Sequence, residues 1–186
     1  HAALGAGALA LLSLAIDEHG PSDARVAQHC VRALGNLAFR SDVARLRIGA
    51  HDAAAQSSAT PGARGAIEVV VDALQRAADA ADDAAAGAAC VALTNVAHNC
   101  EGNRALMTER GVLDALLASM AAFPGVCLLQ RQACWLMLTL AASNAVVEAI
   151  IASGGVGALL AAMVNCPRDA SVQHFGLWAI TNLGWA

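Results

Sequence analysis

The chain alternates between apolar stretches of helical length and short breaks that contain Gly, Pro or polar residues. Within these stretches apolar residues recur every three to four positions, which indicates amphipathic helices rather than strands. Helices are expected over 103–110 and 111–122, and again over 144–153 and 154–165. The second helix of each pair stops before a proline, Pro124 or Pro167. The pattern therefore predicts an all-α fold.

A six-residue motif recurs four times in this pattern. The segments ALGNLA (33–38), ALTNVA (92–97), LMLTLA (136–141) and AITNLG (179–184) align with Asn36, Asn95, Thr139 and Asn182 at one position. These landmark positions are 59, 44 and 43 residues apart. A glycine that opens an apolar stretch recurs in step with them, at Gly5, Gly65, Gly111 and Gly154. Both markers indicate a repeat of about 43 residues that holds three helices.

The repeat predicts that residues 1–186 form a single solenoid segment. It predicts a partial repeat (1–50), a loop insertion (51–64), two full repeats (65–110 and 111–153) and a second partial repeat (154–186). The insertion has its turn at Pro61-Gly62, and it is either a partner-binding loop or tolerated extra length. Because the terminal repeats lack polar caps, we expect the segment to belong to a longer polypeptide or to be covered by another chain.

The third helix of each repeat has two distinct faces when it is drawn at 100° per residue. One face is apolar and is the predicted core stripe, as in Val31, Leu34 and Ala38. The opposite face holds the landmark and the residue four before it: Arg32 with Asn36, Val91 with Asn95, Trp135 with Thr139, and Trp178 with Asn182. An amide repeated in this way either forms a ladder that holds the backbone of a bound peptide or braces the adjacent repeat.

These units resemble armadillo repeats. The resemblance rests on the glycine before the second helix, a small residue six before the landmark, and the Leu-x-Asn-Leu ending of the third helix. It implies a right-handed α-solenoid whose third helices line a concave groove, which importin-alpha-like, beta-catenin-like and vacuolar-scaffold members use to bind proteins. Importin-like members use a Trp and an Asn four residues apart. Trp178 with Asn182 matches that pair, Trp135 with Thr139 matches half of it, and Arg32 and Val91 depart from it.

Charge narrows the class of partner. The chain has 11 basic and 15 acidic residues and no run of five like charges, which excludes a general nucleic-acid binder. The groove-side positions include Arg25, Arg32, Arg40 and Arg131 and, among those considered, no carboxylate. Such a groove is expected to repel a basic localisation signal and to prefer a neutral or acidic protein segment.

The residues offer little chemistry beyond binding. The six cysteines form no CxxC motif and lie mostly in apolar helical stretches, so we expect reduced thiols. That indicates an intracellular protein, in the cytoplasm, with the nucleus or the cilium as alternatives. No His or Cys pair has metal-ligand spacing and no Ser or Cys has an activating His, so we expect no cofactor, no metal and no enzymatic activity. Two uncharged stretches, 1–16 and 149–166, are interpreted as helices of a soluble domain without a membrane span.

The leading functional hypothesis is a non-enzymatic scaffold that grips an extended or helical segment of a partner protein. The predicted partner-binding groove comprises Arg32, Asn36, Asn95, Arg131, Trp135, Thr139, Trp178 and Asn182. The alternative is a structural spacer subunit of a large ciliary or cytoskeletal-type assembly, docked through its convex side and ends. A nuclear transport adaptor is a third hypothesis, which the predicted groove charge disfavours.

Overall fold

The computed structural model describes residues 6–20, 22–56 and 64–184, and all regular structure in these ranges is α-helical. The helices are α1 (Ala6–His19), α2 (Ala24–Ala38), α3 (Asp42–Gln56), α4 (Ala66–Asp79), α5 (Asp83–Ala97), α6 (Glu101–Glu109), α7 (Val112–Ala122), α8 (Cys127–Leu140), α9 (Asn144–Ala152), α10 (Gly155–Asn165) and α11 (Ala170–Leu183). The all-α prediction is confirmed.

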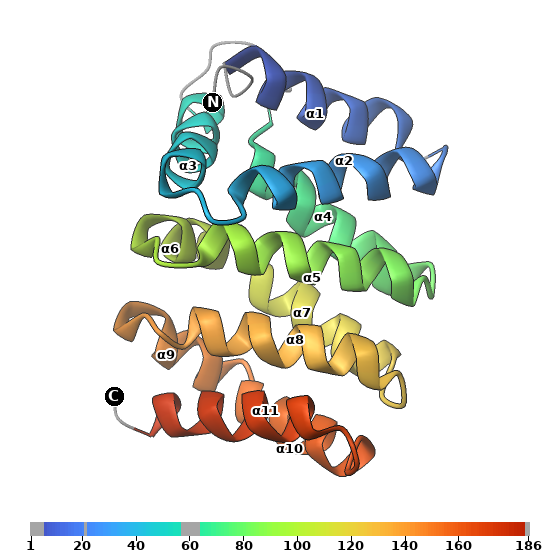
Figure 1. The fold of residues 1–186 in the computed structure, drawn as a ribbon, viewed down its shortest axis with the longest axis vertical. Helices are drawn as coiled ribbons and strands as arrows, with labels where there is room; N and C mark the ends of the chain where they lie inside the picture. Colours follow the sequence, from blue (N-terminus) through green and yellow to red (C-terminus); the bar gives the residue numbers. More distant parts are fainter. Residues whose placement is uncertain (1–5, 21, 57–63, 185–186) are drawn as a thin grey trace.

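The helices form three columns, which Figure 1 shows from the front. The front helices α2, α5, α8 and α11 lie one below the other, and each packs against the next. The back helices α1, α4, α7 and α10 and the side helices α3, α6 and α9 pack in the same successive way. Every repeat thus contributes one layer to a stack, and each layer buries its apolar surface against its neighbours.

The predicted short helices agree with the observed ones to within two residues, whereas the predicted insertion needs correction. Residues 51–56 are not a loop, because α3 continues through them to Gln56. Three consecutive alanines (53–55) favour the helix, and Asp52 is buried on its inner side. The turn expected at Pro61-Gly62 lies outside the described residues.

The front helices α2, α5 and α11 begin where a side chain caps the first turn. The carboxylates of Asp23, Asp82 and Asp169 each accept a hydrogen bond from a backbone N–H in the first turn of α2, α5 and α11. The front helix α8 has no such cap. Instead the Gln130 side chain donates hydrogen bonds of 2.8 and 2.9 Å to two carbonyls at the end of α7. The Gln130 contacts thus tie the front helix α8 to the end of the back helix α7.

The break between side and back helices requires glycine at two points. Gly111 and Gly154 have φ values of 78° and 88°, in the left-handed region that other residues adopt only at a cost. Gly65, at the same point of the preceding repeat, has an ordinary φ of −76°. There a Cβ atom would overlap the Asp52 carboxylate, so glycine is required for space rather than for backbone conformation.

The conformational requirement at Gly154 predicts opposite effects for two neighbouring Gly→Ala substitutions. Gly154→Ala is expected to lower the free energy of unfolding by about 1–2 kcal/mol, because Ala strains in the left-handed region. Gly157→Ala, at an exposed position inside α10 with open space around the added Cβ, is expected to raise it by about 0.5–1 kcal/mol. Urea denaturation followed by circular dichroism measures both, and equal effects at the two sites would contradict the assignment.

The predicted core stripe of the third helices is confirmed in the interior of the stack. Its members on α5 and α8 are all buried: Ala89, Cys90, Leu93, Val96 and Ala97, and Ala133, Cys134, Met137, Leu140 and Ala141. On α11, Leu177 is 56% exposed, although its counterparts Val31, Cys90 and Cys134 are buried. The difference follows from position, because α11 is the last described front helix and no further front helix packs on that side.

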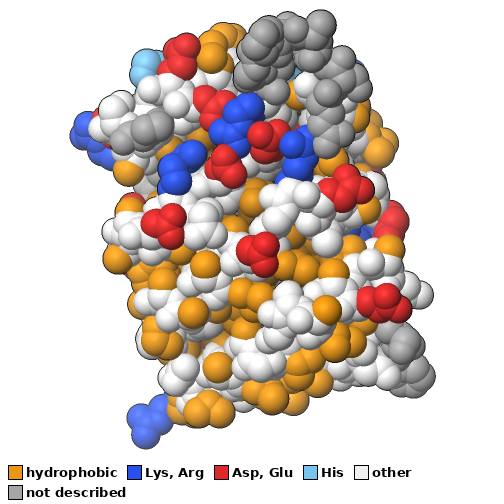
Figure 2. Space-filling view, turned by 180° about the vertical axis from the view of Figure 1, so that it is seen from behind, with side chains coloured by type: hydrophobic (Ala, Val, Ile, Leu, Met, Phe, Trp, Pro, Cys, Tyr) orange, Lys and Arg blue, Asp and Glu red, His pale blue; other side chains and the backbone are white. Residues whose placement is uncertain are grey.

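The back of the molecule divides into a charged half and an apolar half. Figure 2 shows Arg, Asp and Glu side chains gathered in its upper part, and largely hydrophobic and uncharged surface below. Exposed apolar residues in the lower layers include Ile151 on α9 and Leu160 and Val164 on α10. A hollow of about 300 Å³ lies between α7 and α10.

None of the described helices is by itself long and apolar enough to cross a membrane. The uncharged stretch 149–166 is divided between α9 and α10, which meet at 73°. Gly154 lies at this bend.

Candidate functional site

The row of residues four before each landmark lies on the outer surface of the front helices. Arg32 is exposed, Trp135 is 38% exposed and Trp178 is 52% exposed, whereas Val91 is half-buried. The row therefore runs across all four layers with one cation, two indoles and one small aliphatic side chain. Its exposure makes it the first candidate for contact with a partner.

The landmark row is less accessible than predicted. Asn36 is exposed, Asn95 and Asn182 are half-buried, and Thr139 is only 8% exposed. The Thr139 hydroxyl donates a 2.8 Å hydrogen bond to the carbonyl oxygen of Trp135, one turn back in the same helix. Thr139 therefore has to be removed from the predicted binding residues, because its donor is already used and little of it reaches the surface.

Asn95 supports the bracing interpretation of the landmark. Its Nδ2 donates a 3.2 Å hydrogen bond to the carbonyl oxygen of Gly35 on α2, across the interface between two layers. At this interface a Cβ on Gly35 would come within 2.8 Å of the Ala92 Cα, so the two front helices are in close contact. Asn36 and Asn182 make no side-chain hydrogen bond within the described ranges, so the amides do not form a uniform ladder.

On the two lower front helices, α8 and α11, four rings form a continuous aromatic patch, defined as Trp135, His174, Phe175 and Trp178. The Trp135 and Phe175 rings stack across the α8–α11 interface with centroids 5.8 Å apart and planes 16° apart. The His174 ring meets Trp178 edge-on at 5.6 Å. Partly exposed Trp side chains held rigid by neighbouring rings lose little conformational entropy on binding, and Trp is enriched in interface hot spots.

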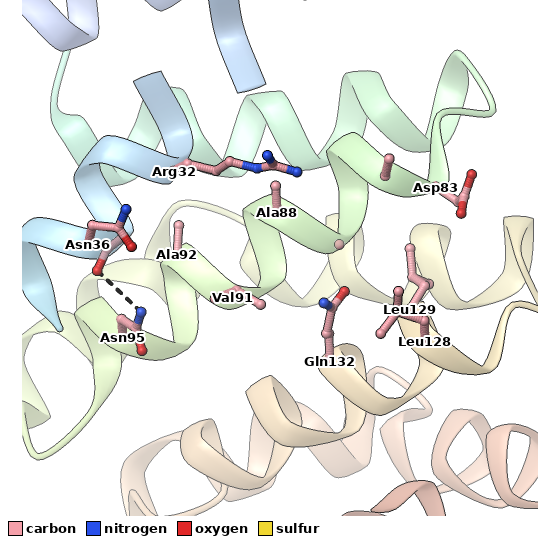
Figure 3. Close-up of a pocket in the computed structure, with 13 residues that line it drawn as sticks. Arg32, Asn36, Asp83, Ala88, Val91, Ala92, Asn95, Leu128, Leu129 and Gln132 are labelled. Atoms are coloured by element: carbon pink, nitrogen blue, oxygen red, sulfur yellow. Dashed lines mark hydrogen bonds between the residues drawn. The ribbon is translucent and has the colours of Figure 1, made fainter. Parts of the chain in front are cut away.

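A hollow lies over the front helix α5, which precedes α8 in the stack. The hollow, called the α5 hollow here, has a volume of about 330 Å³. Figure 3 shows its lining side chains, which come from α2, α5 and α8. They are Arg32, Gly35, Asn36, Asp83, Ala84, Gly87, Ala88, Val91, Ala92, Asn95, Leu128, Leu129 and Gln132. The residues contributed by α5 are mostly Gly, Ala and Val, so the floor of the hollow is apolar and lies close to the α5 backbone.

The charge of this surface differs from the predicted all-basic groove. Arg25 pairs with Asp23 at 2.8 Å and Arg131 pairs with Asp169 at 2.9 Å. Asp83, which the sequence analysis did not place in the groove, lines the α5 hollow. It lies one helical turn before Gly87, and this spacing was the signal that could have identified it. The surface is therefore less basic than predicted, and Arg32 and Arg40 are the predicted groove cations that form no ion pair within the described residues.

Asp169 holds Arg131 in place rather than leaving it for a partner. Burial raises the pKa of the Asp169 carboxyl, but hydrogen bonds from Arg131 and from the backbone N–H groups of Val172 and Ser171 outweigh burial and lower it. The carboxylate thus stays charged at neutral pH and caps α11 at the same time. Arg131 is better described as a support of the α8–α11 interface than as a free binding residue.

Two buried cysteines are poor nucleophiles, and two others differ from the prediction. Burial raises the pKa of the Cys90 and Cys134 thiols to about 12, which keeps both protonated. Cys127 and Cys166 form a disulfide, so the expectation of six reduced thiols is wrong. The bond also removes the argument from free thiols to a reducing compartment. Within 6–20, 22–56 and 64–184, no three His, Cys, Asp or Glu side chains group closely enough to hold a metal ion.

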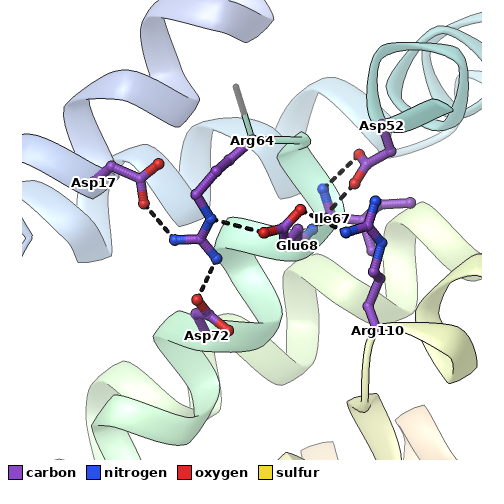
Figure 4. A network of polar contacts seen from close by, with 7 residues as sticks. All are labelled: Asp17, Asp52, Arg64, Ile67, Glu68, Asp72 and Arg110. Atoms are coloured by element: carbon purple, nitrogen blue, oxygen red, sulfur yellow. Dashed lines mark hydrogen bonds and ion pairs between the residues drawn. The ribbon is translucent and has the colours of Figure 1, made fainter. Parts of the chain in front are cut away.

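The densest charge cluster is structural rather than a candidate site. Figure 4 shows Arg64 between three carboxylates. Its guanidinium lies 2.7 Å from Asp17 and 2.8 Å from Glu68, and it also pairs with Asp72. Arg110 reaches Glu68 from the next layer at 2.6 Å. These pairs tie α1, α4 and the α6–α7 junction together, and they leave the charges of the cluster satisfied within the protein.

Comparison with known proteins identifies the fold but no family. No family model matches this chain, and no curated protein matches it. Among solved structures, it is similar to an engineered protein of the Northeast Structural Genomics Consortium, target OR329, with a TM-score of 0.77 and 22% sequence identity. A second engineered protein, target OR497, has a TM-score of 0.51 and 19% identity. This chain is covered to 96% in both comparisons and spans 63% and 48% of those two proteins. At such identities the likeness shows a shared helical fold alone.

Proposed function

We propose that this chain is a segment of an armadillo-type solenoid that acts as a non-enzymatic scaffold and binds a segment of another protein along its front helices. The observation that supports this proposal is that the aromatic patch and the α5 hollow lie on neighbouring front helices, since Gln132, which lines the hollow, is one helical turn before Trp135 on α8. Together they form one surface with exposed indoles, an apolar recess and few free charges. Surfaces of this composition resemble the hot-spot regions of protein interfaces more closely than the general protein surface.

The contacts expected from this surface are of two kinds. Trp135 and Trp178 contribute apolar area, which stabilises a complex by roughly 25 cal/mol for each Å² removed from water. Arg32, Asn36 and Asn182 contribute hydrogen bonds and, at Arg32, one positive charge. A neutral or weakly acidic segment suits this balance better than a basic one. Asn95 and Arg131 support the surface from within the layer interfaces.

The test is a comparison of two double variants, each as the full chain. Trp135→Ala with Trp178→Ala removes the front indoles, and Leu160→Ala with Val164→Ala removes comparably exposed apolar side chains from the back. Loss of a single hot-spot residue costs about 2 kcal/mol or more, so we expect at least about 30-fold weaker partner binding for the front variant. Affinity purification with quantitative mass spectrometry, followed by titration of the captured protein, measures the difference.

A structural spacer is the second candidate function, and the apolar back surface favours it. Leu160 and Val164 lie on α10 next to the hollow between α7 and α10. If the back variant loses the partner and the front variant keeps it, the spacer function replaces groove binding. Both pairs are surface residues, so we expect both variants to keep the fold. Circular dichroism of each variant checks this.

A further inference from the structure

The α5 hollow results from shortened side chains and not from a displaced helix. In three rows across the front helices, α5 carries the smallest residue. Four before the landmark the row reads Arg32, Val91, Trp135 and Trp178. Seven before it reads His29, Ala88, Gln132 and Phe175, and eight before it reads Gln28, Gly87, Arg131 and His174. The backbone of α5 therefore lies at the bottom of a recess walled by longer side chains of α2 and α8.

The recess is held open by the packing of its walls. Gly35 of α2 is in close contact with Ala92, and a Cβ at Gly87 would overlap the Gln132 carboxamide of α8. The backbones of α2 and α5 are thus already at close approach, and on the other side the end of the Gln132 side chain lies against Gly87. Because the hollow is preformed, an occupant gains burial without paying for a rearrangement of the helices.

The rim of the recess carries one charge of each sign. Figure 3 shows Arg32 extending from α2 along the upper edge and Asp83 at the start of α5. Asp83 lies in the first turn of its helix, where the helix dipole already stabilises a carboxylate. Arg32 makes no ion pair within the described residues, so it is the charge that still lacks a counterpart.

From this arrangement we infer that the α5 hollow receives one bulky apolar side chain, such as Leu, Met or Phe, from a partner segment. An adjacent Asp or Glu of that segment pairs with Arg32. The volume of about 330 Å³ lies at the lower end of ligand pockets, which suits a single side chain rather than a large cofactor. This inference rests on the proposed function, and it adds which class of partner sequence the front surface binds.

The probe is a random 12-residue peptide library displayed on phage and selected on the immobilised full chain. We expect the enriched peptides to share a bulky apolar residue close to an Asp or Glu. Ala88→Leu fills the hollow and should weaken the dominant synthetic peptide at least tenfold in fluorescence anisotropy. The matched control Ala145→Leu, at an exposed position of the side helix α9, should leave its affinity unchanged. Enrichment of peptides without this pair of residues would overturn the inference.

A charge reversal tests the inference without filling the hollow. Arg32→Glu should weaken the acidic peptide and strengthen a version in which its Asp or Glu is replaced by Lys, whereas Arg168→Glu, in an exposed loop, should do neither. If selected peptides depend on Trp135 and Trp178 but tolerate both Ala88→Leu and Arg32→Glu, the groove is retained and the hollow is not its specificity site. If the selected peptides tolerate the loss of the two Trp side chains as well, or if no peptide is enriched, the proposed function fails together with this inference.

Discussion

Replacing Cys127 and Cys166 together by Ala is expected to lower the free energy of unfolding by about 3–4 kcal/mol, the chain-entropy value for a loop of this length. The bond joins residues 39 positions apart, at the start of α8 and the end of α10. Without it, the unfolded chain regains the freedom of that loop, and the two lower layers lose their covalent link. Urea denaturation under non-reducing conditions measures the change.

The reductant dithiothreitol supplies the control for this prediction. It should lower the stability of the wild-type protein towards that of the double variant and should leave the variant itself unaffected. Mass spectrometry of the non-reduced chain checks the bond directly through the two hydrogens that it lacks. A wild type that is insensitive to reductant would contradict a stabilising disulfide.

Asp52→Ala is expected to cost about 2–4 kcal/mol, because it removes a buried cap and leaves donors without partners. The fully buried Asp52 carboxylate accepts hydrogen bonds of 2.7 Å from the Ile67 N–H and 3.2 Å from the Glu68 N–H, at the start of α4. It reaches this helix from α3, as Figure 4 shows. Asp52→Asn keeps one acceptor oxygen and should cost less. Equal losses for Ala and Asn would show that the carboxylate does not act as a cap.

The stability of wild type relative to Asp52→Asn is also expected to depend on pH. Burial raises the pKa of the Asp52 carboxyl, although hydrogen bonds from Ile67 and Glu68 oppose the shift. The folded protein therefore keeps this proton to higher pH than the unfolded chain, whose Asp pKa is about 3.9. The stability of wild type relative to Asp52→Asn should accordingly fall as pH rises from about 4 through the folded-state pKa. A relative stability that increases over this range would contradict the raised pKa.

The sequence was informative wherever local signals and burial agree. Gly111 and Gly154 mark real breaks between helices, and α7 and α10 end at the predicted positions, two residues before Pro124 and Pro167. Apolar residues spaced at the helical period identified the core stripe, because the same spacing is buried in successive layers. Trp135 and Trp178 were placed on the exposed face by the same wheel.

Its failures come from contacts between residues that are distant in the chain. Thr139 is an exception, because it follows the landmark pattern and yet is only 8% exposed, with its hydroxyl donating to the Trp135 carbonyl of its own helix. The α3 extension is stabilised by Asp52 capping a helix that begins 14 residues later, at Ala66, which no local pattern reveals. The charge of the groove was overestimated because Arg131 and Asp169, 38 residues apart, pair only after the layers stack.

The columnar arrangement of the helices has a mechanical consequence. The substantial interfaces among the described front helices join successive members only, from α2 to α5, α5 to α8 and α8 to α11. Small changes of angle at each junction therefore add up along the stack, while the individual cores stay intact. The Cys127–Cys166 bridge spans one junction alone, and it should make the lower end stiffer than the upper one.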